Sequence, residues 1–398
     1  MKKTLIAFAA LSAIAGMAQA QSTVTLYGVL DLNVGSYKIN AFSATTNVPN
    51  PLSQTNVSSG GLSGSRFGFR INEDLGGGLA AIGNLEGGVS ADAGSSAQGG
   101  LLFGRQANVG LASTSLGSVT IGRNKSPYYD VTSGTHLGQS IFDTASQPNN
   151  AISNIAAPAN FVAGTKNLSD AGLLATTKYL LSNHDGQSNI NSSTALGFNA
   201  RIDNSIRYTT PTFSGFSASA LYGFGENKSA TQDASRVISA TAQYANGPIL
   251  GYAGYQSDAV ATRSNGAKPT LENILVGGSY NFVVAKVGAS FNRAKLKDVS
   301  TVSGGVIGPQ KEFAASVAVP LGAATIQAGY SQSKGNTFGK ATGFGVQALY
   351  TLSKRTTLYT GYSSVKAYDK LTNSDVLLAS GGSIARSTLF AAGVRHTF

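Results

Sequence analysis

The sequence predicts an all-β protein, a transmembrane antiparallel β-barrel of about sixteen strands. Three observations favour this fold class. Segments of about ten residues alternate apolar and polar side chains, which is the length a tilted strand needs to cross a bilayer. Gly (49 residues), Tyr (16) and Phe (18) are abundant, Cys is absent, and charged residues make up only 12% of the chain, a composition that favours strands over a helical bundle or a disordered chain. Short turns and long polar connections alternate along the chain.

The start of the chain has the order of a secretory signal peptide. Two lysines precede an apolar core at residues 4–17, and residues 18–20 (Ala-Gln-Ala) offer small side chains at the positions that a signal peptidase reads. The apolar core is short for a bilayer-spanning helix. We therefore expect residues 1–20 to be removed on export and residues 21–398 to form the barrel.

Period-two alternation recurs along most of the chain after residue 20. In the first segment Val24, Leu26 and Leu30 share one face, and small or polar residues occupy much of the other. Many apolar rows end in Tyr or Phe, which suits the aromatic girdles of a membrane barrel. A soluble β-sandwich would need a second apolar face, whereas the second face here is polar and small. Strands are predicted at 23–36, 62–73, 78–91, 100–113, 117–124, 201–211, 215–226, 233–246, 248–258, 271–282, 284–296, 310–320, 323–333, 341–352, 356–368 and 385–398.

The connections between these strands are of two kinds. Short ones carry turn residues, as in EDLGGG (73–78), TSLG (114–117), ANGP (245–248) and SKRT (353–356). Longer polar ones alternate with them, as at 37–61, 91–99, 259–270, 297–309 and 369–384. Outer-membrane barrels have short periplasmic turns and longer external loops. With an even number of strands, both chain ends then fall on the periplasmic side.

Residues 125–200 form a connection much longer than the others, rich in Asn, Ser, Ala and Gly and with weak periodicity. A connection of this length in a compact protein is normally functional or disordered. The lumen of a sixteen-stranded barrel is open to water, so a long loop can fold inward and narrow it. The alternatives are that the loop spreads over the cell surface or forms extra strands. We expect part of it to fold inward as a constriction.

An ordered set of motifs extends over nearly the whole chain. The segments are VTLYGVLD (24–31), SGGLSGSRFGFRINEDLGGGLAAI (59–82), LFGRQANVGL (102–111), SVTIGRNKSPYYD (118–130), NSIRYTTPTFSGF (204–216), YTLSKRTTLYTGY (350–362) and GVRHTF (393–398). In this order they resemble the trimeric general porins of Gram-negative bacteria, especially those of β-proteobacteria. The resemblance implies a homotrimer of sixteen-stranded barrels in the cell outer membrane, each with its third external loop folded into the pore. It also implies that Phe398 is the recognition signal for the outer-membrane assembly machinery.

Arginines are the candidates for ion selection. Alternation turns Arg66 and Arg70 away from the apolar face of their strand, and it turns Arg207 inward. The resemblance places Arg66 and Arg105 on the pore wall near the constriction, and Arg123 lies at the mouth of the long loop. Fixed positive charge in a narrow pore concentrates anions, and arginine keeps that charge at any relevant pH. The alternative is that each arginine only forms a wall salt bridge, for instance with Glu73, Asp74 or Glu86.

Four residues of the 125–200 stretch are candidates for the constriction loop: Lys125, Tyr128, Asp130 and Asp143. Porins of the resembled family usually place acidic residues of this loop opposite the basic wall. The loop departs here from the family's usual length, so the residue that faces the arginines stays open. A weak acidic side would shift the pore further towards anions.

The predicted function is therefore that of a general-diffusion porin, a water-filled outer-membrane channel for small hydrophilic solutes and ions that prefers anions. A substrate-specific outer-membrane channel is the alternative. The other expected partners are a second and third copy of the chain, outer-membrane lipid and lipopolysaccharide, which calcium could bridge to acidic loops.

Other classes of function are not expected. The formal net charge is +11, but the basic residues are dispersed rather than clustered, which argues against nucleic acid as a partner. The three histidines, His136, His184 and His396, fall in no Ser/His or metal-ligand pattern. We therefore expect no enzyme activity, no cofactor and no metal site.

Overall fold

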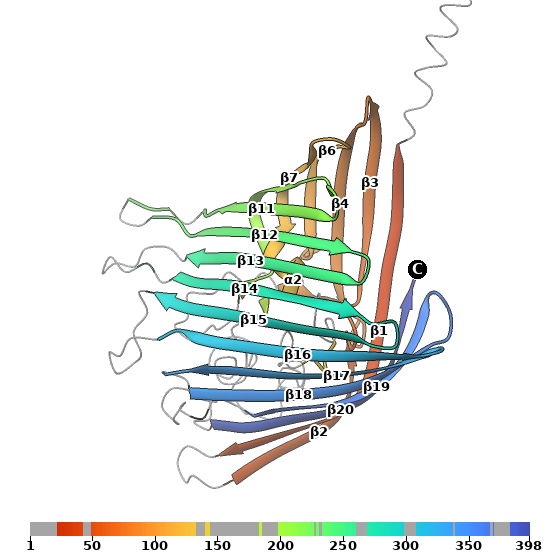
Figure 1. Ribbon diagram of the computed structural model, residues 1–398, viewed down its shortest axis with the longest axis vertical. Coiled ribbons are helices and arrows are strands. Elements are labelled where there is room, and N and C mark those ends of the chain that lie inside the picture. The colour runs from red at the N-terminus through yellow and green to blue at the C-terminus, as the bar shows by residue number, and fades with distance from the viewer. Residues whose placement is uncertain are drawn as a thin grey trace, which may run out of the picture.

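The computed structural model describes residues 22–42, 49–132, 140–143, 183–184, 198–226, 228–230, 233–259, 268, 270–297, 308–336, 339–366, 369 and 383–398. Within them the chain forms a closed antiparallel β-barrel of sixteen strand positions (Figure 1), so the predicted fold class is confirmed. The barrel strands are β1 (Thr23–Phe42), β2 (Pro49–Ser59), β3 (Arg66–Gly76), β4 (Leu79–Ser90), β6 (Gln106–Ser113), β7 (Gly117–Lys125), β10 (Arg201–Thr209), β11 (Phe216–Phe224), β12 (Arg236–Asn246), β13 (Ile249–Ala259), β14 (Thr270–Asn281), β15 (Lys286–Lys297), β16 (Gln310–Leu321), β17 (Ala324–Gly335), β18 (Gly339–Thr351), β19 (Thr356–Lys366) and β20 (Ser383–Thr397).

Each wall strand pairs with the next along the chain, and the first strand closes the ring. One edge of β1 pairs with β20, from Val29↔Thr397 onward. The other edge pairs with β3 over its first half and with β2 over its second half. Strands β2 and β3 therefore fill one position in the wall, interrupted at residues 60–65. Closure pairs the first strand with the last, so the sheet does not end in a free terminal strand.

The two faces of the wall differ as the alternation predicts. On β1 the side chains of Leu26, Leu30 and Val34 are exposed on the outside, while Asp31 and Asn33 are buried on the inside. The same division recurs around the barrel, with large apolar side chains outward and Ser, Asn and Gln inward. Within the described residues, no helix is long and apolar enough to cross a membrane. The apolar outer band is the surface expected of a barrel in lipid.

Two expectations about the first loop were wrong. The connection predicted at 37–61 is largely strand, because β1 continues to Phe42 and β2 pairs with it as far as Phe42↔Pro49. Most residues of β2 are polar and two are proline, so hydropathy alternation gave no signal for this strand pair. The strand predicted at 62–73 begins instead at Arg66, because residues 60–65 leave the ladder.

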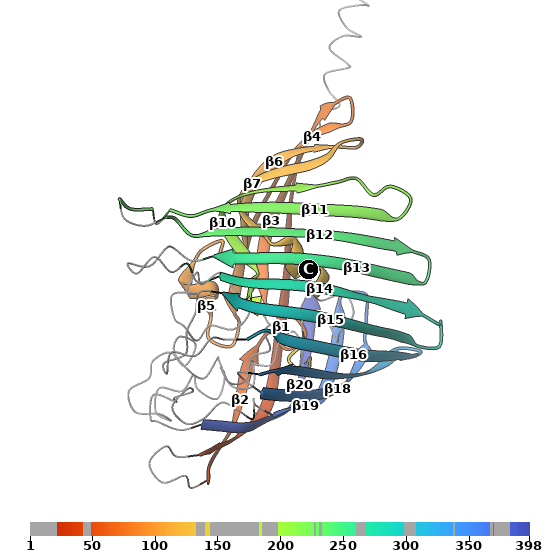
Figure 2. The same ribbon diagram turned by 60° about the vertical axis from the view of Figure 1, so that its left-hand side comes forward.

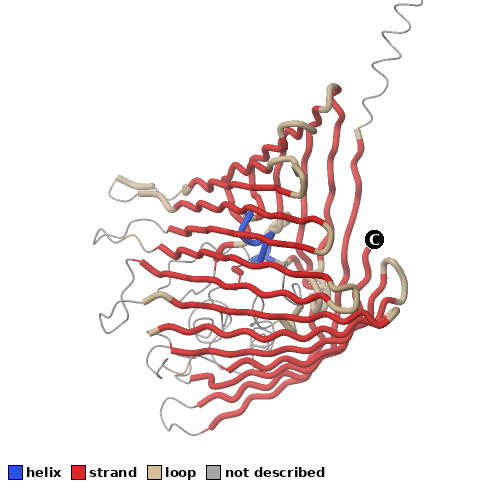
Figure 3. The backbone as a smooth tube through the Cα atoms, in the orientation of Figure 1, coloured by secondary structure: helices blue, strands red, loops and turns tan. Residues whose placement is uncertain are grey.

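Two described pieces of the long connection lie within the barrel. One is the helix α2 (Pro127–Thr132), which contacts β11, β12 and β13 and is seen behind β13 and β14 in Figure 1 and as the blue coil in Figure 3. The other is the segment 140–143, where the backbone N–H of Ile141 donates to the Gly61 carbonyl at 2.8 Å. Figure 2 shows the wall of β10 to β15 that carries α2.

The remaining described elements are short. They are β5 (Ser95–Ser96), the 3-10 turn η1 (Gln98–Gly100), β8 (Asn183–His184) and β9 (Phe198–Asn199). The predicted signal peptide, residues 1–20, lies outside the described residues, as does most of 144–197.

Candidate functional site

Two of the predicted arginines share one carboxylate on the inner wall. The Nε of Arg105 lies 2.7 Å from Glu86 Oε1, and the Nε of Arg66 lies 3.4 Å from Glu86 Oε2. The Tyr27 hydroxyl also donates to Glu86, at 2.9 Å. Glu86 extends from β4 and Arg66 from β3, while Arg105 precedes β6, so three neighbouring positions supply one cluster. The wall salt bridge with Glu86 therefore forms, and it leaves two guanidinium groups around one carboxylate.

Arg70 lies further along the same face of β3. Its guanidinium carbon is 4.2 Å from the centre of the Tyr27 ring, a cation–π arrangement. The Tyr27 hydroxyl bonds both Glu86 and Asn84, so the ring is held in place beside the guanidinium. No ion pair of Arg70 is seen among the described residues, and its side chain is exposed. Its charge is therefore open to the solvent of the lumen.

Arg123 occupies a bulge between β7 and β10. The pairing shifts between Ile202 and Ser205, where β10 carries one more residue than β7. Gly122 has a φ of +121° at this point, a backbone conformation in which a residue with a side chain would be strained. Arg123 donates through Nε to the Gly104 carbonyl at 2.7 Å and forms an ion pair with Asp203. The bulge thus ties Arg123 into the wall, two residues before the end of β7.

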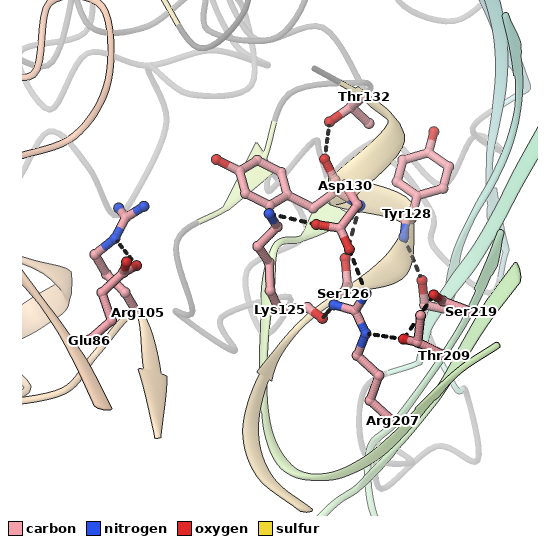
Figure 4. A network of polar contacts seen from close by, with 12 residues as sticks. Glu86, Arg105, Lys125, Ser126, Tyr128, Asp130, Thr132, Arg207, Thr209 and Ser219 are labelled. Carbon is pink, nitrogen blue, oxygen red and sulfur yellow. Dashed lines mark hydrogen bonds and ion pairs between the residues drawn. The ribbon is translucent and has the colours of Figure 1, made fainter. Parts of the chain in front are cut away.

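Asp130 is the acidic residue of the loop that meets the basic wall. Its carboxylate contacts the Lys125 ammonium at 2.5 Å and the Arg207 guanidinium at 2.7 Å (Figure 4). Arg207 also donates to the Lys125 carbonyl at 3.0 Å. Lys125, expected in the loop, is the last residue of β7, because its backbone still pairs with Arg201. The three side chains hold one negative and two positive charges.

Tyr128 anchors the helix α2 to the wall strands β12 and β15. Its hydroxyl donates to Asn292 Oδ1 at 2.9 Å, and its backbone N–H donates to the Ser239 hydroxyl at 3.0 Å. Its ring packs edge-on against Phe198, 4.7 Å between ring centres. Complete burial, followed by the charge of Glu312, raises the pKa of the Tyr128 hydroxyl well above its ordinary value of 10.0.

Asp143 lies in another described piece of the loop than Asp130. It is buried in the segment 140–143, and its backbone N–H donates to the Ser140 carbonyl at 2.9 Å. The Ser140 hydroxyl of the same segment bonds Gln347 on β18. Asp130 is an acidic loop candidate that the structure brings to a predicted arginine, Arg207.

Arg201 is a basic residue of this region that the sequence pattern did not indicate. It opens β10, is only 3% exposed, and lies with its guanidinium carbon 5.7 Å from the centre of the Tyr129 ring. Arg105 and Glu86 are both near enough to act on it electrostatically. Alternation could not identify it, because the bulge at residues 203–204 separates it from the regular part of β10. Its place at the start of the strand predicted at 201–211 was the only available signal.

The chain terminus lies at the seam of the barrel. The Phe398 carbonyl accepts from the Gly28 N–H at 3.0 Å, and the Phe398 N–H donates to the Gly28 carbonyl at 3.1 Å. A Cβ on Gly28 would lie 2.2 Å from the Phe398 ring, so the missing side chain is what admits the aromatic group. The last residue therefore joins the first strand.

On these strands and helix α2, basic side chains outnumber the carboxylates that pair with them. Around these strands the basic side chains are Arg66, Arg70, Arg105, Arg123, Lys125, Arg201 and Arg207, and the acidic ones that pair with them are Glu86, Asp130 and Asp203. Within the described part of the chain, no three His, Cys, Asp or Glu side chains gather as a metal site would require. His396, the one histidine whose side-chain contacts are described, bonds the Thr356 hydroxyl at 2.9 Å. The arrangement suits electrostatic selection of solutes.

Comparison with known proteins agrees with this geometry. The Gram-negative porin family matches residues 7–370. The chain is 30% identical to an outer membrane porin protein of Bordetella pertussis and 31% identical to outer membrane porin protein 32 of Delftia acidovorans, over the full length of both chains in each case. An anion-selective porin from Comamonas acidovorans superposes with a TM-score of 0.70 at 26% identity, covering 95% of this chain and 100% of that one. OmpT of Vibrio cholerae, at 18% identity and a TM-score of 0.55, shares the fold. The chain therefore belongs to the Gram-negative porin family and is a porin of the bacterial outer membrane.

Proposed function

We propose that this porin is a general-diffusion channel that prefers anions, and that its inner arginines set the preference. The observation that carries the proposal is a group of seven basic side chains on this inner wall that share three paired carboxylates, those of Glu86, Asp130 and Asp203. Fixed charge on the low-dielectric walls of a narrow, water-filled opening concentrates ions of the opposite sign. The similarity to an anion-selective porin supports the same preference.

The inward pieces of the 125–200 connection form the constriction in this proposal. Helix α2 rests on β11 to β13, and the segment 140–143 reaches Gly61 and β18. The basic side chains of β3, β7 and β10, with Arg105 just before β6, and the loop carboxylate of Asp130 then border the remaining opening. Solutes pass by diffusion, so no residue needs to act as a catalyst.

The proposal extends to assembly. Three copies form the channel unit, as is typical of the family, and residues 1–20 direct export. Phe398, at the seam beside Gly28, presents the terminal aromatic group to the outer-membrane assembly machinery before the barrel closes. Lipopolysaccharide surrounds the external rim.

The test is to neutralise the arginines that share Glu86. Purified Arg66→Gln/Arg105→Gln protein in a planar bilayer under a KCl gradient should show a reversal potential nearer zero. The chloride-to-potassium permeability ratio should fall roughly two- to tenfold, because two fixed charges leave the opening. Arg293→Gln is the matched control, since Arg293 lies on the face of β15 opposite the inward Asn292. An equal shift in both variants, or none in the double variant, would refute the arginine assignment.

A further inference from the structure

A buried carboxylate on the first strand has no part in the basic cluster. Asp31 of β1 is 0% exposed. Its Oδ1 accepts from the Gly61 N–H at 3.0 Å and from the Tyr359 hydroxyl at 2.5 Å. Its Oδ2 accepts from the N–H groups of Leu62 and Ser63 at 2.8 and 2.9 Å. Four donors around one carboxylate provide the hydrogen bonding that a buried charge requires.

These donors hold the interruption between β2 and β3. The Gly60 N–H donates to the Asp31 carbonyl at 2.7 Å, and the Ser65 hydroxyl donates to the same carbonyl at 3.0 Å. Residues 60–65 therefore wrap around Asp31 instead of continuing the ladder. Gly61 is packed so tightly that a Cβ there would lie 1.8 Å from the Tyr359 hydroxyl oxygen. Asp31 thus fixes both the path of this kink and the position of Tyr359.

The inward segment 140–143 rests on the structure that Asp31 holds. The Ile141 N–H donates to the Gly61 carbonyl at 2.8 Å. Phe142 is completely buried, and its ring meets the Tyr359 ring nearly edge-on, 6.5 Å between centres. A Cβ on Gly361 would lie 2.9 Å from the Phe142 ring, so the β19 backbone forms the floor beneath it. The segment therefore contacts both structures that Asp31 holds in place, the kink through Gly61 and the ring of Tyr359.

We propose that Asp31 and Tyr359 form a latch that positions the segment 140–143 and thereby fixes the width of the pore. The proposal rests on the proposed function, in which this segment is part of the constriction. Asp31 acts as a positioning residue: it contacts the kink and Tyr359, and it acts on the opening through them. Loss of its charge releases the Gly61 carbonyl and the Tyr359 ring together, which removes two supports of the segment and leaves its contacts with β18 and the Gly361 backbone.

A thiol reporter tests the latch directly, because the chain has no cysteine of its own. Ser140 is 1% exposed, so Ser140→Cys should react slowly with a small water-soluble maleimide in the folded barrel. Adding Asp31→Asn or Tyr359→Phe should speed the reaction about tenfold or more, since each removes a buried hydrogen-bond partner. Tyr359→Phe keeps the ring and loses one hydroxyl, so it remains informative if Asp31→Asn fails to fold.

Two controls separate a local latch from general loosening. Val131→Cys places a thiol in α2, where Val131 is 3% exposed against another wall, and its rate should not change with Asp31→Asn. Tyr208→Phe removes a hydroxyl that bonds Leu116 on the outer surface, and it should leave the Ser140→Cys rate unchanged. Equal acceleration of both thiols by the latch variants, or no acceleration of Ser140→Cys, overturns the proposal.

The bilayer readout links the latch to the pore. Tyr359→Phe channels should show noisier open current and close at lower voltage than the parent, whereas Tyr208→Phe channels should match it. Quiet, unaltered currents from a variant whose Ser140→Cys thiol is accelerated would overturn the claim that the latch fixes the pore width. A parent protein that folds but does not conduct would refute the proposed function. The reaction rates of the Ser140→Cys thiol would still test the latch in that case.

Discussion

Glu86 lies between two guanidinium groups, and this arrangement explains how Arg66 and Arg105 can share one patch of wall. Their like charges repel, and the carboxylate offsets that repulsion while bonding the Tyr27 hydroxyl as well. A salt bridge and a selective role are therefore compatible here. One carboxylate neutralises one guanidinium, and the other charge remains for solutes.

Glu86→Gln follows from this at the residue scale. The variant keeps the shape of the side chain and removes its charge, so the reversal potential should move further in the chloride direction. Folding should weaken by roughly 1–3 kcal/mol, because a largely buried charged acceptor is lost. Bilayer recordings and urea unfolding in detergent check the two effects. A shift towards potassium would show that Glu86 chiefly orients the arginines.

The buried hydroxyl of Tyr128 in α2 makes the stability of the folded protein depend on pH. Burial raises its pKa in the folded protein, so above about pH 10 the unfolded chain ionises first and the stability from the neutral hydroxyl is lost as pH rises. Each such group contributes about 1.4 kcal/mol per pH unit in that range. Between pH 9 and 11 the free energy of unfolding of Tyr128→Phe, measured in urea, should therefore fall less steeply with pH than that of the parent protein. Parallel slopes would contradict the burial of this hydroxyl.

At the scale of elements, the bulge between β7 and β10 directs the side chains of the basic wall. It depends on Gly122, whose φ is +121° and whose Cβ would lie 2.3 Å from the Ala107 carbonyl oxygen. The extra residue in β10 brings Asp203 to Arg123 and leaves Arg201 beside Tyr129. A regular ladder would not produce this order of side chains.

Gly122→Ala should consequently destabilise the barrel by roughly 1–3 kcal/mol. Gly251→Ala is the matched control, because Gly251 lies in β13 and a Cβ added there would have no heavy atom within 4 Å, and its effect should stay within about 0.5 kcal/mol. The temperature at which the folded band disappears on electrophoresis measures both. If both variants lose the folded band at the same temperature, the bulge carries no strain that a side chain at position 122 increases.

The sequence predicted the wall strands well, since period two is fixed by the pleat and the outer face must be apolar. Strands such as β16 and β17 were placed within two residues. It did not predict β2, whose polar residues pair beyond the apolar band, or α2, which is only six residues long and folds against other strands. Tertiary packing rather than local pattern determines both.

The site was predicted unevenly for the same reason. Alternation indicated the faces of Arg66, Arg70 and Arg207, because each lies on a regular strand. It could not indicate Arg201 beyond a bulge, and it could not choose Asp130 over Asp143 as the partner of the wall. That choice depends on how the loop folds within the barrel, which brings Asp130 within 2.7 Å of Arg207.

In the whole molecule, the strands that close the barrel also support the inward pieces of the long loop. The seam joins β1 to β20 and seats Phe398 on Gly28, and β1 also supplies Asp31 beneath the kink. The described inward pieces then rest on different walls, α2 on β11 to β13 and residues 140–143 on β18, β19 and the kink. A rigid ring thus supports the loop on both sides of the opening.

The reversal potential of the unaltered, purified protein in a planar bilayer under a KCl gradient decides whether this channel prefers anions. We expect ohmic conductance that arrives in steps of three and a reversal potential of the sign for chloride. A potential of the sign for potassium would contradict the role given to the arginines. A folded barrel without conductance would contradict the channel itself.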